Sequence, residues 1–126
     1  MKELLNEQQL RKGVVELSQT INQAYGERPL TILGVLTGSV VLLADMIRLL
    51  KMPLRVGVVL AKSYRGAETT RGPLTINAEL MPDITERDIL IVDDIFDTGH
   101  TLAELTLLME ELGPKSIRSA VLLRKH

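Results

Sequence analysis

The chain has 126 residues, of which 45% are hydrophobic, so it fits one domain with a substantial core. Lys and Arg (15) nearly balance Asp and Glu (16), and the formal net charge of -1 provides no electrostatic basis for a nucleic-acid partner. The absence of cysteine excludes disulfides and thiolate metal sites and favours a reducing, cytoplasmic environment, and no apolar run reaches the roughly 20 residues needed to cross a membrane.

The first part of the chain is predicted to contain a helix, a strand and a second helix. Apolar residues at helical spacing predict an amphipathic helix over about residues 7–25. The apolar run over residues 30–36 includes β-branched side chains and predicts a buried strand. A tight turn at residues 37–39 then leads into a helix over about residues 40–51, which Pro53 closes.

The middle of the chain is predicted to form a β-ribbon. Alternating apolar residues predict a strand from Leu54 to about Tyr64, and residues 74–80 predict the strand that returns beside it. Residues 65–73 have no periodicity and contain glycine, so we interpret them as a long mobile loop that joins the two strands.

The last part of the chain is predicted to supply a core strand, a helix and a final strand. Residues 89–92 predict the core strand, and residues 117–123 predict the final strand. Gly113 and Pro114 are typical of a helix end followed by a residue that cannot continue the helix. The core stripe of this helix is predicted to consist of Leu102, Leu105, Leu108, Met109 and Leu112.

Strands that alternate with helices in this way predict an α/β fold, with a parallel twisted sheet flanked by helices. In such sheets, ligands bind beyond the carboxyl ends of the strands. The segments that follow residues 30–36 and 89–92 both come directly after strands, so we expect both of them at that one edge.

The strongest functional signal is an acidic motif at the second of these strand ends. Asp93 and Asp94 adjoin, and Asp97 precedes a short turn, residues 98–101, that opens a helix. Adjacent carboxylates repel each other unless a cation or a donor lies near them, and vicinal hydroxyls of a ribose or a Mg²⁺ ion meet that need. The N–H groups of the turn lack intrahelical partners and suit a phosphate. From its spacing alone, Asp97 is equally a helix N-cap or a proton acceptor that faces the ligand.

Two further segments carry weaker signals. Thr37 and Gly38 favour a second anion site, but an ordinary tight turn with Ser39 as the N-cap explains them equally well. Ser63 and Tyr64 precede the long loop and fit either the hinge of a lid or a plain strand end. Neither of the two glycine-rich nucleotide-binding fingerprints occurs in the sequence.

The acidic motif, Ile-Leu-Ile-Val-Asp-Asp-Ile-Phe-Asp-Thr-Gly-His-Thr-Leu, resembles the phosphoribosyl pyrophosphate (PRPP) signature of type I phosphoribosyltransferases. Asp97 makes it similar to the 6-oxopurine branch, the hypoxanthine(-guanine) phosphoribosyltransferases. Residues 36–39 resemble the pyrophosphate loop of that branch, and residues 63–64 resemble the start of its flexible lid. The resemblance covers nearly the whole chain.

This resemblance implies a purine-salvage enzyme that transfers the 5-phosphoribosyl group from PRPP to hypoxanthine or guanine, giving IMP or GMP and pyrophosphate. Asp93 and Asp94 would engage the ribose hydroxyls directly or through Mg²⁺, the implied cofactor. Asp97 would act as general acid or base near purine N7. The other implied binding residues are Thr37 and Gly38 for pyrophosphate, Ser63 and Tyr64 for the lid, and Asp97, Thr98, Gly99, His100 and Thr101 for the 5′-phosphate.

This chain departs from the family pattern in two respects. Many relatives have Lys where Thr37 stands, and relatives continue beyond the position of His126. We therefore expect residues 1–126 to form a single phosphoribosyltransferase domain without the C-terminal hood of the family. Lys125 comes too early in the sequence for the Lys that reads the purine 6-oxo group. The resemblance implies a homodimer or a homotetramer.

Two other functions remain to be weighed. A regulatory protein on the same fold could bind PRPP or a nucleotide without useful turnover; Asp97 disfavours this alternative. A phospho-receiver domain also opens with apolar residues followed by paired acids. It would require more strands and helices than the residues after Asp94 can supply.

Overall fold

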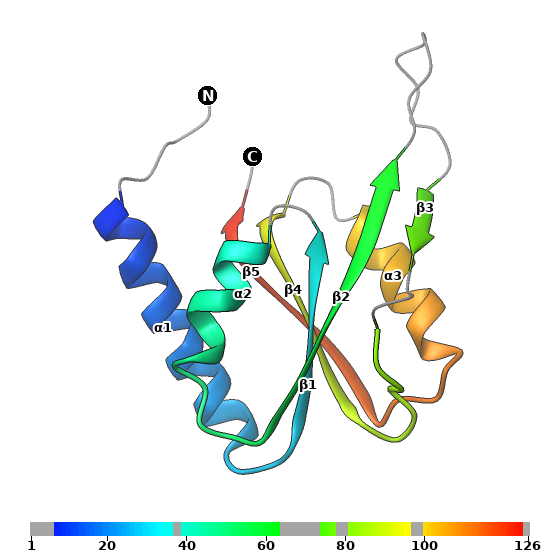
Figure 1. Ribbon diagram of the computed structural model, residues 1–126, viewed down its shortest axis with the longest axis horizontal. Helices are drawn as coiled ribbons and strands as arrows, with labels where there is room; N and C mark the ends of the chain where they lie inside the picture. Colours follow the sequence, from blue (N-terminus) through cyan, green and yellow to red (C-terminus); the bar gives the residue numbers. More distant parts are fainter. Residues whose placement is uncertain (1–6, 37–38, 64–73, 78–80, 97–99, 125–126) are drawn as a thin grey trace, which may run out of the picture.

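A computed structural model describes residues 7–36, 39–63, 74–77, 81–96 and 100–124 of the chain. They form a five-stranded sheet in the order β3-β2-β1-β4-β5, flanked by helices (Figure 1). The parallel strands are β1 (Leu30–Leu36), β2 (Leu54–Ser63), β4 (Asp88–Phe96) and β5 (Ser116–Arg124), and β3 (Leu74–Asn77) runs antiparallel to β2. The helices are α1 (Glu7–Tyr25), α2 (Val40–Ile47) and α3 (His100–Glu110). The predicted α/β fold with a β-ribbon is confirmed.

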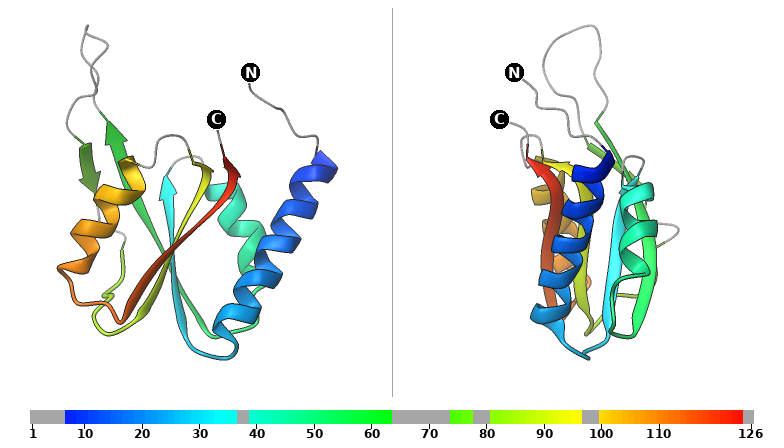
Figure 2. Two further views of the ribbon diagram at one scale, coloured as in Figure 1. Left: turned by 180° about the vertical axis from the view of Figure 1, so that it is seen from behind. Right: turned by 90° about the vertical axis from the view of Figure 1, so that its left-hand side faces the viewer.

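The helices cover opposite faces of the sheet, with α1 and α2 on one face and α3 on the other (Figure 2). Successive residues of a strand alternate between the faces. Accordingly, Leu90 and Val92 of β4 pack in one core with α1 and α2, whereas Ile89 and Ile91 pack in a second core with α3. Both faces of β4 are therefore buried, as its continuous apolar run predicts.

The first helix and the first strand match the predicted ranges, but α2 is shorter than expected. It ends at Ile47, well before Pro53. The side chain of Asn22 on α1 explains the early end, because its amide donates to the carbonyl of Leu49 (3.0 Å) and accepts from the N–H of Lys51 (2.9 Å). These bonds hold the chain in a turn where a helix would otherwise continue.

The predicted core stripe of α3 is only partly right. Leu102, Leu105 and Met109 are buried, but Leu108 is 49% exposed and Leu112 is 48% exposed. At 100° per residue, Leu108 falls beside the stripe, and Leu112 lies beyond the end of the helix. The predicted helix end is confirmed, since Gly113 has a φ of +76° and its N–H donates to the carbonyl of Glu110.

The remaining differences lie in the ribbon and at the ends of the strands. The return strand β3 ends at Asn77, and the predicted residues 78–80 lie outside the described residues, as does the predicted loop, residues 65–73. The final strand, β5, contains the predicted residues 117–123. Among the helices that the structure describes, none is long and apolar enough to span a membrane.

At the amino ends of the strands, a buried tyrosine connects α1 to the sheet. The guanidinium groups of Arg28 and Arg118 lie 5.4 and 5.5 Å from the centre of the Tyr25 ring. Arg28 also approaches Asp88 (4.0 Å), whose carboxylate accepts a hydrogen bond from Ser116 (2.6 Å). This cluster anchors the end of α1 to the start of β4 and β5, far from the carboxyl ends of the strands.

Candidate active site

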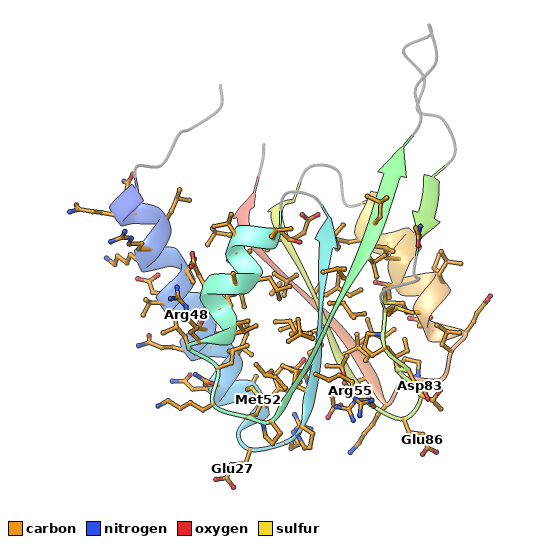
Figure 3. All side chains as sticks on the ribbon, in the orientation of Figure 1. Glu27, Arg48, Met52, Arg55, Asp83 and Glu86 are labelled. Atoms are coloured by element: carbon orange, nitrogen blue, oxygen red, sulfur yellow. The ribbon has the colours of Figure 1, made fainter. Side chains whose placement is uncertain are left out.

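The candidate site lies at the carboxyl edge of the sheet, where both predicted strand ends meet. The parallel strands all end at this edge, and α2 and α3 both begin there (Figure 1). The charged residues Arg55, Asp83 and Glu86 lie at the opposite end of the molecule (Figure 3). The expectation that the two segments share one edge is therefore confirmed.

The centre of this edge is a topological switch point between β1 and β4. After β1 the chain crosses through α2 to β2 on one side, and after β4 it crosses through α3 to β5 on the other side. The last paired residues of the two central strands are Gly34 and Val92. Beyond that pair β1 and β4 separate, and a crevice opens at such a point in open α/β sheets.

Asp93 is the first residue of β4 beyond this last pair. It lies beside Val121 of β5 and is half-buried, in the row of β4 that faces α3. The predicted end of this strand at residue 92 is wrong, because β4 continues to Phe96. Its pairing with β5, up to Phe96 and Arg124, extends the strand through the acids. Tertiary pairing here overrides the low strand propensity of aspartate.

The start of α2 is held tightly against the end of β1. Ser39 is fully buried, and its hydroxyl donates to the carbonyl of Val35 (2.5 Å) instead of capping the helix. A Cβ atom on Gly34 would lie 2.9 Å from Cδ2 of Leu43 and 3.0 Å from the hydroxyl oxygen of Ser39, so a larger residue would require buried neighbours to move. The Ser39 side chain, turned toward the strand, leaves the first N–H groups of α2 without a side-chain cap, which is the arrangement that suits an anion.

Gly34 and Ser39 were not among the predicted site residues. A glycine inside an otherwise apolar strand indicates a close approach of another backbone, so Gly34 carried a signal in the sequence. The sequence predicts Ser39 either as part of the second anion site, within the segment 36–39 that resembles the pyrophosphate loop, or as a plain N-cap. It occupies the N-cap position, but its hydroxyl bonds to the strand, and only the packing of α2 on β1 decides between these two partners.

The start of α3 is the second helix N-terminus at this edge. His100 and Thr101 are its first residues, and the buried Leu102 and Leu105 fix the helix on the sheet. The backbones of Ser63, the last residue of β2, and of Asp94 lie at the same edge. The other predicted residues lie outside the described residues: Thr37, Gly38, Tyr64, Asp97, Thr98 and Gly99.

The donor set at this edge suits a hard cation. Carboxylate oxygens are the ligands that Mg²⁺ prefers. Asp93 supplies one in the row of β4 that faces α3, and Asp94 belongs to the alternate row of the same strand. Among the residues described by the structure, no cluster of three or more His, Cys, Asp or Glu side chains forms a metal site. Asp97 and the side chain of Asp94 lie outside the described residues.

Comparisons with known proteins identify the fold and the family of sequences. A family model described as "Phosphoribosyl transferase domain" matches residues 1–126. The chain is 34% identical over 122 residues to the hypoxanthine-guanine phosphoribosyltransferase of Staphylococcus epidermidis, covering 97% of this chain and 68% of that protein. It is also 34% identical over 128 residues to that of Aquifex aeolicus, covering 99% and 71%.

Solved structures agree with this result. A hypoxanthine-guanine phosphoribosyltransferase from Bacillus anthracis superimposes with a TM-score of 0.88 at 30% identity, over 99% of this chain and 74% of that one. A hypoxanthine phosphoribosyltransferase from Trypanosoma cruzi superimposes with a TM-score of 0.85 at 31% identity, over 99% and 69%. The chain therefore spans about 70% of the length of such relatives.

Proposed function

Because this chain belongs to the phosphoribosyltransferase family, and to its hypoxanthine-guanine branch, we propose that the carboxyl edge of the sheet binds PRPP and a 6-oxopurine. The enzyme acts in purine salvage. It transfers the 5-phosphoribosyl group from PRPP to hypoxanthine or guanine, which gives IMP or GMP and pyrophosphate. The matching relatives are named as enzymes, so a regulatory protein without turnover gains no support.

The observation that carries the site assignment is the placement of two helix N-termini at one edge of the sheet. The start of α2 lies at the end of β1, and the start of α3 follows β4, with Asp93 just beyond the last pair of these strands. PRPP carries a diphosphate at one end of its ribose and a phosphate at the other. This edge therefore offers an anion site for each end and carboxylates for the sugar between them.

Each end of the substrate is assigned to one segment. Thr37 and Gly38, which precede α2 in the sequence, are assigned to the pyrophosphate, and the following residue, Ser39, is bonded to Val35 of β1. The residues that lead into α3, Asp97 to Thr101, hold the 5′-phosphate through their N–H groups and hydroxyls. Asp93 and Asp94 bind the ribose hydroxyls, and a Mg²⁺ ion on these carboxylates would neutralise the charge of the diphosphate.

The reaction breaks the bond between C1 of the ribose and the pyrophosphate oxygen and forms a bond from C1 to the purine nitrogen. Asp97 accepts the proton from purine N7 while the new bond to C1 forms, so the base does not become positively charged. In the reverse direction Asp97 returns that proton. Ser63 and Tyr64 lead into a lid that excludes water from the cationic sugar, which water would otherwise hydrolyse.

The cofactor, the oligomeric state and the location complete the proposal. Mg²⁺ is the cofactor, for which the paired carboxylates supply suitable ligands. The protein forms a homodimer or a homotetramer in the cytoplasm, and a composition without cysteine agrees with that reducing compartment.

A turnover assay with three bases tests this function. With PRPP and Mg²⁺, we expect a version that carries a C-terminal segment like that of the relatives to convert hypoxanthine or guanine to the nucleotide and pyrophosphate, and to leave adenine unconverted. Residues 1–126 alone should bind PRPP but turn over poorly. Pyrophosphate release and nucleotide formation are measured in parallel, so that hydrolysis of PRPP is distinguished from transfer. Equal rates with adenine would overturn the assignment.

A further inference from the structure

The hydroxyl of Ser39 bonds to the strand before α2 and not to the helix that it begins. A serine at the N-cap normally accepts a hydrogen bond from an N–H of its own helix, and this cap stabilises the helix. The Ser39 hydroxyl instead donates to the carbonyl of Val35 (2.5 Å), which also accepts from the Ser39 N–H (3.3 Å). One carbonyl of β1 therefore holds both donors of Ser39.

Burial keeps the hydroxyl in this position. Ser39 is fully buried, and a Cβ atom on Gly34 would lie 3.0 Å from the hydroxyl oxygen and 2.9 Å from Leu43. If the hydroxyl turned away, the carbonyl of Val35 would retain only the longer bond from the Ser39 N–H. Loss of a buried hydrogen bond is unfavourable, so the packing of α2 on β1 selects the bond to the strand.

The first turn of α2 consequently lacks the groups that usually neutralise a helix N-terminus. Among the side chains that the structure describes, none caps this helix, and residues 40–43 include no acid. The Leu43 N–H closes the first turn by donating to the carbonyl of Ser39 (2.8 Å), so the N–H groups of residues 40–42 precede the first bond of the helix. Aspartate and glutamate are favoured at such a position, and their absence leaves its positive charge to a ligand.

We propose that Ser39 is a positioning residue for the diphosphate end of the substrate. Its bond to Val35 fixes the backbone between β1 and α2 and keeps the first N–H groups of α2 available, while the hydroxyl itself does not contact the ligand. The inference rests on the proposed function, which assigns the preceding residues, Thr37 and Gly38, to pyrophosphate. It adds a residue that acts through the backbone of that segment.

This role predicts an effect on one end of the substrate only. Pyrophosphate and PRPP both carry a diphosphate, whereas ribose 5-phosphate carries only the phosphate that is assigned to the segment leading into α3. Loss of the Ser39 hydroxyl should therefore weaken binding of the first two ligands and leave ribose 5-phosphate unaffected. A residue that served only the fold would not distinguish between these ligands.

Titration of the chain with these three ligands in the presence of Mg²⁺, followed by the NMR shifts of its backbone amides, tests the proposal. Ser39→Ala should raise the dissociation constants of pyrophosphate and PRPP about fivefold or more, because one buried hydrogen bond that holds the segment is lost. The matched control is Ser18→Ala on α1. Ser18 is as buried as Ser39, but its hydroxyl has no hydrogen-bond partner among the described residues, so all three constants should stay unchanged.

Ser39→Cys provides a second variant, which carries the test if Ser39→Ala does not fold. Its thiol is a weak donor, so its dissociation constant for pyrophosphate should lie above that of the wild type and below that of Ser39→Ala. Unchanged pyrophosphate binding in the Ser39 variants, or equal weakening of all three ligands, would overturn the proposal. A wild-type chain that binds neither pyrophosphate nor ribose 5-phosphate would instead contradict the proposed function, and this inference with it.

Discussion

Gly34 and Ser39 approach each other so closely that a Cβ atom on Gly34 would lie 3.0 Å from the hydroxyl oxygen of Ser39. This approach joins the end of β1 to the start of α2, the segment to which pyrophosphate binding is assigned. The Ser39 hydroxyl is also bonded to Val35, so it cannot turn away without losing a buried hydrogen bond. The glycine is thus a requirement of the candidate site and of the fold.

Gly34→Ala should therefore lower both stability and substrate affinity. We expect a loss of about 1–3 kcal/mol in the free energy of unfolding, measured in urea, because the buried neighbours must move. The KM for PRPP should rise with it. Gly13→Ala is the control, since its Cβ atom would also meet a neighbour at 3.0 Å, but that neighbour is the end of the partly buried Leu122 side chain, whereas Gly34 faces both the buried Leu43 and the buried, hydrogen-bonded Ser39. Stability should not fall in the control, because alanine favours the helix.

Asn22 should prove important for the packing of α1 against the turn that follows α2. Asn22→Ala removes both of its hydrogen bonds to that turn and should cost about 1–2 kcal/mol of stability. Asn22→Asp keeps the acceptor for the N–H of Lys51 but places a carboxylate oxygen against the carbonyl oxygen of Leu49, so its loss should be at least as large as that of Asn22→Ala. Thermal unfolding of both variants would show this order; the reverse order would contradict the assigned role.

Tyr25 should make stability depend on pH in alkaline solution. Its hydroxyl is buried without a hydrogen-bond partner among the described residues, and burial raises the pKa of Tyr25 above its usual value of 10.0. The unfolded chain then releases this proton at a lower pH than the folded chain. The contribution of protonated Tyr25 to the free energy of unfolding is therefore complete below pH 10.0 and is lost as the pH rises through the pKa that Tyr25 has in the folded protein.

Tyr25→Phe isolates this effect. At neutral pH the variant should be as stable as the wild type or more stable by up to about 1 kcal/mol, because it buries no unpaired hydroxyl. Above pH 10.0 its advantage should grow, since it has no proton to release at this position. Unfolding curves of both proteins across that range provide the measurement. A constant difference between them would argue against titration of Tyr25.

Asp97→Ala should reduce turnover far more than PRPP affinity. If Asp97 transfers a proton at purine N7, kcat should fall roughly 10²–10⁴-fold while the KM for PRPP changes little. Asp83→Ala is the matched control, because this aspartate is exposed at the opposite end of the molecule and should leave both constants unchanged. Loss of PRPP affinity without loss of turnover would assign Asp97 to binding instead.

Asp94→Ala should weaken PRPP binding more than it lowers turnover. The proposed contact of this carboxylate with the ribose hydroxyls or with Mg²⁺ is present before the chemical step, so its loss should raise the KM for PRPP and the Mg²⁺ concentration required. Titration calorimetry with PRPP at several Mg²⁺ concentrations measures this change directly. An Asp94→Ala enzyme with unchanged PRPP binding would remove this residue from the site.

The sequence by itself determined the elements and the chemistry of the motif. The range of α1 and of β1 follows from apolar periodicity, which needs no distant contact. The acidic residues and the start of α3 are local features as well, because they depend on consecutive residues of the chain and not on a distant contact. For this reason the family resemblance was readable from residues 89–102, and the comparisons confirm the family.

Tertiary contacts alone decided the rest. The hydrogen bonds of Asn22 end α2 at Ile47, and pairing with β5 carries β4 through Asp93 to Phe96. The packing of α3 against the sheet determines which of its leucines are buried. Each of these outcomes depends on a partner that is distant in the sequence, so local propensity could not supply it. The switch point at the carboxyl edge has the same origin, because it depends on the pairing of β1 with β4, which extends only as far as Gly34.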